Sequence, residues 1–362
     1  MSAQAWATSG SGPASVREGR LAVIIVHYKT PEMLRECLDS LAPELDPGRD
    51  QVLVVDNASG PEHVEALRAA TERPGVRLIA SETNLGFAGA NNLALRTVLE
   101  ESERERSVPP ELFMLLNPDT LVRPGAVGVL REFLAGHEEA DLVGPRLEFP
   151  DGAAQLSAFG DPTPISELVR GANIGPITRL LRRWEVYGEV KNRAHRADWL
   201  SGACVMMRRR VIEEVGLLDD EFFMYYEEVD FFRRARRRGF QAWYVPEAHV
   251  VHLVGQASGV EWKKAARRLP GYWFESRQHY FRKHFGWLGM VAADGAWMTG
   301  YCLMRVRRLV TGYSPSIVAQ GEFRDLARQS WRGMWKRRGA PRGGAGRDGG
   351  AVRALVVGEG IR

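Results

Sequence analysis

Four apolar runs typical of β-strands, each followed by a segment with helical spacing, constrain the fold of this chain most. The runs cover residues 21–28, 51–56, 76–81 and 111–117. Continuous apolar character, without alternation, is typical of strands buried on both faces by helices, as in a parallel sheet. The sequence therefore predicts an α/β fold whose first half is a doubly wound unit with a mostly parallel central sheet.

The rest of the chain divides where composition changes. Short strands are expected at 142–145, 146–149, 199–207 and 241–245, with a helix at 228–238, whereas the Pro- and Gly-broken stretch 161–196 predicts a mobile loop. We expect a flexible N-terminal segment (1–20), one domain in two halves (21–140 and 141–260), a basic, aromatic, helical C-terminal region (261–338) and a disordered tail (339–362).

The positive charge is concentrated in the C-terminal region. The chain carries net charge +4, but residues 263–338 hold 16 lysines and arginines against four acids, interleaved with tryptophan and tyrosine. Such a mixture favours an anionic membrane surface rather than nucleic acid, and it also suits helices packed on the main domain. The apolar stretch 288–304 is too short, and too interrupted by Asp294, to span a bilayer.

The cysteines and the N-terminal residues indicate the compartment. Cys37, Cys204 and Cys302 are too scattered for a disulfide framework or a zinc ribbon, and no apolar run precedes residue 21. We expect a cytoplasmic protein, peripheral on the inner face of the cell membrane if the basic region binds lipid.

Polar clusters follow three successive strands. Asp56 ends the second run, Asn84 follows the third, and Asn117-Pro-Asp119 ends the fourth. A single strand-end aspartate is usually a turn residue, but the carboxyl ends of parallel strands meet in one crevice, so three such clusters predict a ligand site.

The residue types in these clusters favour a nucleotide sugar. No GxGxxG or GxxxxGK[ST] motif follows the first strand, which disfavours dinucleotide redox enzymes and P-loop NTPases. The Asp56 carboxylate suits the N3–H of a uracil or thymine ring. Asp119 is a hard oxygen ligand for Mg²⁺ or Mn²⁺ against a diphosphate.

Five ordered motifs between Leu21 and Gly286 resemble the inverting family 2 glycosyltransferases of GT-A fold, in particular the bacterial rhamnosyltransferase-like subgroup. The motifs are Asp56-Asn-Ala-Ser, Asn84-Leu-Gly-Phe-Ala-Gly-Ala-Asn-Asn, Asn117-Pro-Asp, Trp199-Leu-Ser-Gly-Ala and Phe223-Met-Tyr-Tyr-Glu-Glu-Val-Asp. The resemblance implies transfer of a sugar, L-rhamnose from dTDP-rhamnose above others, from a nucleotide diphosphate to a cell-envelope glycan or lipid-linked acceptor. A UDP-hexose donor is the alternative.

The resemblance implies that residues 21–140 form the nucleotide-binding half of the domain and residues 141–260 the acceptor-binding, catalytic half. It also implies roles for individual residues. Asp56 would recognise the pyrimidine, and Asn84, Gly86 and Asn91 would line the nucleotide pocket. Asp119 occupies the metal-binding place of the DxD motif, of which only one carboxylate is present here, and His252 stands where relatives supply a late metal or diphosphate ligand. The expected cofactor is Mg²⁺ or Mn²⁺.

Inversion requires a carboxylate that takes the acceptor hydroxyl proton on the face opposite the leaving diphosphate. The family pattern Glu-Asp-x-Asp reads Glu227-Glu228-Val-Asp230 here, which makes Glu228 the expected base and Glu227 a substitute. These acids also complement the dipole of a helix N-terminus. Asp230 would face the donor sugar or the acceptor, or pair with a nearby arginine.

The segment Trp199-Leu-Ser-Gly is expected to face the sugar, with Ser201 and Gly202 leaving room for a hexose ring and Trp199 offering an aromatic plane or core packing.

Two rival functions remain at this point. A nucleotidyltransferase would need a Gly-rich basic loop after the first strand, and residues 26–31 contain no glycine. A non-catalytic, membrane-associated carbohydrate-binding scaffold would not need the complete set of acids.

Overall fold

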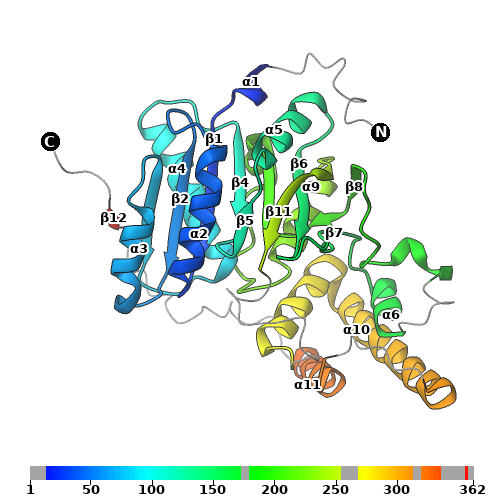
Figure 1. Ribbon diagram of the computed structural model, residues 1–362. Coiled ribbons are helices and arrows are strands. Elements are labelled where there is room, and N and C mark those ends of the chain that lie inside the picture. The colour runs from blue at the N-terminus through cyan, green and yellow to red at the C-terminus, as the bar shows by residue number, and fades with distance from the viewer. Residues whose placement is uncertain (1–13, 173–178, 254–267, 313–318, 336–354, 358–362) are drawn as a thin grey trace.

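The computed structural model describes residues 14–172, 179–253, 268–312, 319–335 and 355–357 of the chain. A ten-stranded sheet with helices on both faces forms the main body, and a layer of helices formed by α6, α10 and α11 lies beyond one end of it (Figure 1). Two apolar clusters fill the two faces of the sheet, one containing Leu34 and Met114 and the other Leu95 and Phe113.

The first half confirms the four predicted strand–helix units. The parallel strands run in the order β3-β2-β1-β4, and Pro31 begins the first covering helix at a position where its missing N–H is no loss. The elements are β1 (Leu21–His27), α2 (Pro31–Leu41), η1 (Ala42–Glu44), β2 (Gln51–Asn57), η2 (Pro61–His63), α3 (Val64–Thr71), β3 (Val76–Ser81), α4 (Gly86–Arg104), β4 (Leu112–Leu116), β5 (Thr120–Val122) and α5 (Ala126–Gly136).

The second half extends the same sheet through β10, β6, β11 and β5, with β10 antiparallel to both β4 and β6. The two short strands expected at 142–149 form one strand, and the strand expected at 199–207 is divided by a turn at Ser201–Ala203. The elements are β6 (Leu142–Glu148), β7 (Ala158–Phe159), β8 (His195–Ala197), β9 (Trp199–Leu200), β10 (Cys204–Arg208), α8 (Arg209–Val215), α9 (Glu227–Arg237) and β11 (Ala242–His252).

The mobile loop predicted for 161–196 is wrong in part, because its described residues include α6 (Pro164–Ala172), η3 (Arg182–Trp184) and the start of β8. The helix α6 depends on a distant partner: a Cβ on Gly171 would collide with the backbone of Trp297, and one on Gly300 with that of Leu168. Such a close helix crossing cannot be read from the local sequence.

The two ends of the chain are partly ordered. Residues 14–17 form α1, where Val16 is buried against the main core. In the segment expected to be disordered, Leu355–Val357 forms β12, which pairs antiparallel with β3, and the rest of that tail lies outside the described residues.

The predicted helical character of the C-terminal region is confirmed by α10 (Gly271–Thr311), which is kinked at Gly286, and α11 (Glu322–Trp335). Arg277 is fully buried between Glu167 of α6 and Asp294, and Arg170 joins Glu167 to Glu322 of α11. Buried pairs of this kind hold α6, α10 and α11 as one unit, because removing one member leaves an uncompensated charge. Among the described residues, no helix combines the length and the apolar character needed to cross a membrane.

Candidate active site

Asp56, at the end of β2, is held in place by two neighbours on its Oδ1 atom. The Thr30 N–H donates to His27 Nε2 (2.9 Å), so the neutral His27 ring carries its proton on Nδ1 and donates it to Asp56 (3.2 Å), while the Ser59 hydroxyl donates to the same oxygen. Burial raises the pKa of Asp56, but these hydrogen bonds outweigh it, so the pKa lies below its ordinary value. Asp56 is therefore a fixed carboxylate at the end of β2.

A second group of polar residues fixes the start of α4 beside Asp56. Asn57 donates to Asn84 Oδ1 (3.1 Å) and to the Gly86 carbonyl (3.2 Å), and Asn84 accepts from the Gly86 N–H (2.9 Å). Gly86 has φ +71°, and a Cβ there would collide with the Phe223 carbonyl oxygen, which accepts the Phe87 N–H (3.0 Å). The glycine is thus required by the close approach of the 223 segment to the helix start.

Asn91, the remaining predicted nucleotide residue, is buried one turn into α4 and donates to the Phe87 carbonyl (2.9 Å). Its neighbour Asn92 exchanges two hydrogen bonds with the backbone of Leu218 and therefore tethers α4 to the loop after α8.

Asp119 and His252 meet because β5 pairs with β11, with Thr120 opposite His252. The Nε2 atom of His252 lies 3.6 Å from Asp119 Oδ1, which is buried and has no hydrogen-bond partner. Burial lowers the pKa of His252, and the charge of Asp119 opposes that effect. An orphaned carboxylate oxygen beside a neutral imidazole fits a divalent cation, since both are ordinary ligands for Mn²⁺ and the oxygen suits Mg²⁺. No group of three or more such ligands occurs in the described part of the chain, so a cation here would take its other ligands from substrate or water.

Glu227 and Glu228 begin α9, and the Oε2 atom of each is buried without a hydrogen-bond partner among the described residues. Burial and the neighbouring Glu228 charge raise the pKa of Glu227 well above its ordinary value, and burial raises the pKa of Glu228 as well. Glu227 is almost enclosed, whereas Glu228 is only partly buried. Of the two acids, Glu228 is therefore the more accessible one.

The turn that aims these two acids is strained. Tyr225 and Tyr226 both have positive φ (68° and 69°), a conformation that bulky residues seldom adopt. Ser276 of α10 donates to the Met224 carbonyl (2.9 Å), and the Tyr226 ring lies against Trp273 and Tyr280. The C-terminal helices thus hold the turn before α9.

The segment after β9 lies beside Glu228. A Cβ on Gly202 would be in van der Waals contact with Glu228 (3.7 Å to its Cβ) and with Phe87, so the Gly202 backbone lies directly next to the acid. Trp199 stacks on Phe159 (4.0 Å between centroids) and donates to the Gly160 carbonyl (2.8 Å), while the Ser201 N–H donates to the Ser157 carbonyl (2.9 Å). The Trp199 ring therefore borders the segment that leads to Gly202 and also packs on Phe159.

Asp230 differs from its two acidic neighbours. It is fully buried and contacts Arg234, Lys283 and His284 at 2.7 Å each. Burial raises its pKa, but the hydrogen bonds from these three residues and the charge of Arg234 lower it to about 2. Pairing with an arginine, one of the two roles expected for Asp230, is thus observed, and the residue joins α9 to α10 rather than facing the cleft.

The sequence reasoning missed His27, Ser59 and Phe223, which position predicted residues. His27 ends a strand that is otherwise wholly apolar, and this single polar residue was the available signal. The contribution of Phe223 is made by its backbone carbonyl, for which no sequence signal exists.

Comparison with known proteins identifies the family. The profile of glycosyltransferase-like family 2 matches residues 19–271, well over half of the chain. The chain belongs to this family. This family 2 glycosyltransferase is 29% identical over 274 residues to an N-acetylglucosaminyl-diphospho-decaprenol L-rhamnosyltransferase of Mycobacterium tuberculosis, covering 74% of the chain and 86% of the relative. It is 30% identical over 219 residues to the low-salt glycan biosynthesis hexosyltransferase Agl10 of Haloferax volcanii, covering 60% and 62%, and 22% identical to rhamnosyltransferase WbbL of Escherichia coli, covering 68% and 88%.

A solved structure supports the predicted GT-A type of fold. The mannosyltransferase PcManGT of Pyrobaculum calidifontis, in complex with GDP-Man and Mn²⁺, superposes with a TM-score of 0.52 at 16% identity and covers 92% of this chain and 91% of its own. The fold prediction and the assignment as a glycosyltransferase are confirmed, and with them the non-catalytic scaffold and the nucleotidyltransferase lose their support.

Proposed function

We propose that this glycosyltransferase transfers L-rhamnose from dTDP-rhamnose, with inversion, to a lipid-linked glycan acceptor of the cell envelope. One observation carries the proposal: a fixed carboxylate (Asp56), an orphaned metal-ligating oxygen (Asp119) and an unpartnered glutamate (Glu228) border the carboxyl ends of the central strands. The names of the M. tuberculosis and E. coli relatives support rhamnose, and the first of them supports an acceptor sugar carried on a polyprenyl diphosphate.

The donor nucleotide is assigned to the edge formed by β2 and the start of α4. The Asp56 carboxylate accepts the N3–H of the pyrimidine, and its lowered pKa keeps this acceptor ionised at neutral pH. Asn84 and Gly86 shape the adjoining wall, and Asn91 lies behind it on α4.

Asp119 and His252 are proposed to hold Mg²⁺ or Mn²⁺ at the donor diphosphate. Such an ion, when bound, stabilises negative charge that develops on the leaving phosphate oxygens.

Glu228 is proposed to act as the base. It takes the proton of the acceptor hydroxyl while that oxygen bonds to the anomeric carbon, and the bond from this carbon to the diphosphate oxygen breaks on the opposite face. A raised pKa makes a carboxylate a stronger base near neutral pH. Gly202 lies next to Glu228 without a side chain of its own, and the acceptor sugar is proposed to bind there, with Ser201 and Trp199 as its flanks.

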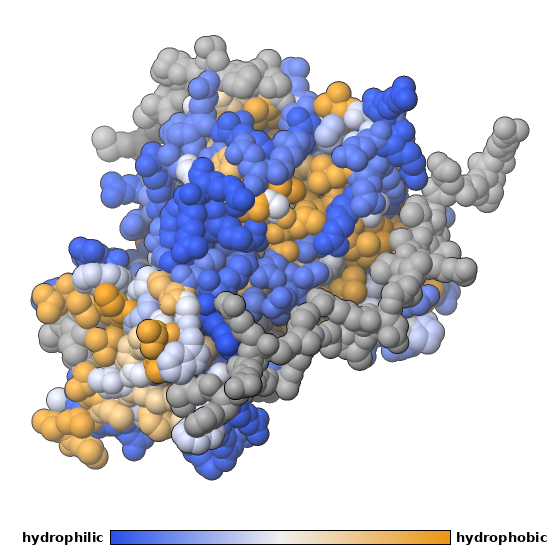
Figure 2. Space-filling view, turned by 180° about the vertical axis from the view of Figure 1, so that it is seen from behind, coloured by the Kyte–Doolittle hydropathy of each residue, from blue (hydrophilic) through white to orange (hydrophobic). Residues whose placement is uncertain are grey.

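A peripheral position on the inner face of the cell membrane is part of the proposal, and its support is the far half of α10. Leu303, Val306, Leu309 and Val310, here named the α10 patch, are 42–85% exposed and stand among the exposed arginines Arg305 and Arg308. Figure 2 shows apolar residues gathered on this helical layer, at the lower left. Apolar side chains interleaved with arginines suit the boundary between anionic headgroups and acyl chains.

A donor screen tests the function. The protein is incubated with Mn²⁺ and dTDP-rhamnose, UDP-glucose or GDP-mannose, and thermal stabilisation and turnover onto a prenyl-diphosphate-linked N-acetylglucosamine are measured. Stabilisation and turnover with dTDP-rhamnose above the other donors are expected. A preference for UDP-glucose would instead favour a general hexosyltransferase, as the name of the H. volcanii relative suggests.

A further inference from the structure

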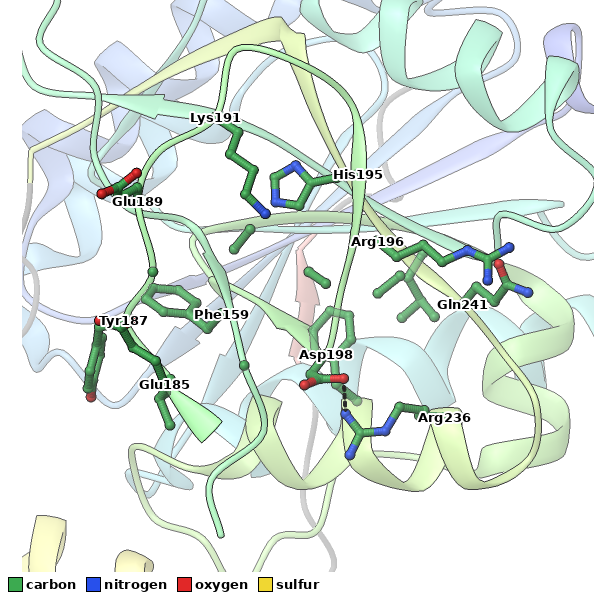
Figure 3. Close-up of a pocket in the computed structure, with 18 of the residues that line it drawn as sticks. Phe159, Glu185, Tyr187, Glu189, Lys191, His195, Arg196, Asp198, Arg236 and Gln241 are labelled. Carbon is green, nitrogen blue, oxygen red and sulfur yellow. Dashed lines mark ion pairs between the residues drawn. The ribbon is translucent and has the colours of Figure 1, made fainter. Parts of the chain in front are cut away.

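A hollow of about 930 Å³ lies away from the strand ends that form the donor site. Its walls are β7, β8, the segment 179–191, the second half of α9 and the first residue of β11, whereas His252 of the metal pair is the last residue of β11. We name it the cationic hollow after four of its lining residues, Arg179, Arg182, Lys191 and Arg196; Figure 3 shows Lys191 and His195 pointing into the same space.

The charges in the hollow are unevenly balanced. Arg179, Arg182 and Lys191 have no ion-pair partner among the described residues, and Arg196 lies over the ring of Trp243 rather than on an acid. Arg236, by contrast, is neutralised by Asp198 (2.7 Å), the pair marked in Figure 3. Glu185 and Glu189 are the remaining acids of the lining. A concave surface with unpaired cations in excess attracts an anionic ligand.

The aromatic end of the hollow lies beside β9, the strand that leads to Gly202. Phe159 and Tyr187 line the hollow and meet edge to face at 5.9 Å, and Phe159 also stacks on Trp199 of β9. Gly202, three residues after Trp199, lies beside Glu228. Arg236 of the lining follows Glu228 by two turns of α9, about 12 Å along the helix. The strand β9 and the helix α9 therefore connect the hollow to the segments that hold Gly202 and Glu228.

We propose that the cationic hollow binds the diphosphate of the acceptor, while the Phe159 and Tyr187 rings contact the acceptor sugar. The inference rests on the proposed function, because it requires a sugar whose hydroxyl faces Glu228 and whose anomeric end carries a diphosphate. Leu180, 81% exposed beside Arg179 and Arg182, offers an apolar contact to the lipid chain that would follow. The donor diphosphate is assigned to Asp119 and His252, so the two diphosphates have separate sites.

Calorimetric titration with farnesyl diphosphate in EDTA tests the hollow without metal and without turnover. The variant Arg182→Ala/Lys191→Ala removes two lining cations, and Arg183→Ala/Arg193→Ala removes the same charge from the same segment outside the lining. We expect the dissociation constant to rise on the order of tenfold in the first variant and to stay within about twofold in the second. Equal affinities in both variants, or no binding to the wild-type protein, would overturn the inference.

Steady-state turnover separates this inference from the proposed function. With a prenyl-diphosphate-linked N-acetylglucosamine, Arg182→Ala/Lys191→Ala should raise KM for the acceptor and leave KM for dTDP-rhamnose unchanged, while a methyl glycoside acceptor should show no difference. Unchanged acceptor KM would refute the hollow and leave the function standing. Absence of turnover in the wild-type protein would refute the function, and the calorimetric result would still decide the hollow. Vesicles containing phosphatidylglycerol should bind both double variants equally. Loss of vesicle binding in Arg182→Ala/Lys191→Ala alone would assign the hollow to lipid headgroups and overturn the proposal.

Discussion

The donor side and the acceptor side of the cleft are built in opposite ways. On the donor side, Asp56 and Asn84 sit at strand and helix ends and are fixed by hydrogen bonds within the first half of the chain. On the acceptor side, Glu227 and Glu228 keep unpartnered oxygens and depend on a strained turn that α10 holds in place. The comparison suggests that the groups that bind the nucleotide are satisfied before the substrate arrives, whereas the proposed base and the proposed metal ligand Asp119 keep unsatisfied oxygens at a cost in stability.

The largest expected effect comes from the acceptor side. Glu228→Gln keeps the shape of the side chain but cannot take a proton, so turnover should fall on the order of 10²- to 10⁴-fold while donor affinity persists. Glu227→Gln is the matched control and should retain more activity, because Glu227 is almost enclosed whereas Glu228 is only partly buried. Turnover of the wild-type protein should also decline as the pH falls through the raised pKa of Glu228, since only the ionised form accepts a proton. The reverse order of the two variants would move the base to Glu227.

The sequence predicts the donor side better than the acceptor side for a physical reason. Asp56, Asn84 and Asp119 each follow a strand, and the rule that parallel strands end at one edge brings them together. Asp119 and His252 do meet, although 133 residues separate them, because of one strand pairing. Three features of the acceptor side depend on contacts with α10, and no local sequence pattern predicts such contacts. They are the pairing of Asp230, the helix α6 and the left-handed backbone of Tyr226.

A second test concerns the metal pair. In Asp119→Asn, stabilisation by dTDP with Mn²⁺ in thermal melts should disappear, while the melting temperature without metal should be unchanged or higher, because an unpaired buried carboxylate is removed. Turnover of the wild-type protein that persists in excess EDTA would contradict the metal assignment.

A third test measures the stability that α10 lends to the acceptor side. Asp230→Asn should lower the free energy of unfolding at pH 7 by about 2 kcal/mol, the value of a pKa lowered from 3.8 to about 2. This contribution is present above the unfolded pKa and is lost as the pH falls from about 4 towards 2, so the difference from wild type in urea melts should shrink over that range. The exposed Asp39, paired with Arg35 and Arg73, is the control, and Asp39→Asn should cost less than about 1 kcal/mol. Equal losses of unfolding free energy in the two variants would show that Asp230 has no special structural role.

The smallest expected effect concerns the α10 patch. Leu309→Glu/Val310→Glu should reduce cosedimentation with phosphatidylglycerol vesicles several-fold at low salt, and added salt should weaken binding of the wild-type protein. Val108→Glu changes an exposed apolar residue far from α10 and should have no effect. Wild-type protein that ignores these vesicles at low salt would show that the patch has another role.

The anomeric configuration of the product tests the central claim most directly. The cleft is proposed to place Glu228 opposite the leaving diphosphate, so one displacement should occur and the transferred sugar should have the configuration opposite to that in the donor. We propose to follow wild-type turnover of dTDP-rhamnose by proton NMR and to read the anomeric signal of the first product formed. Inversion is the predicted result, and a product that retains the donor configuration would contradict the account.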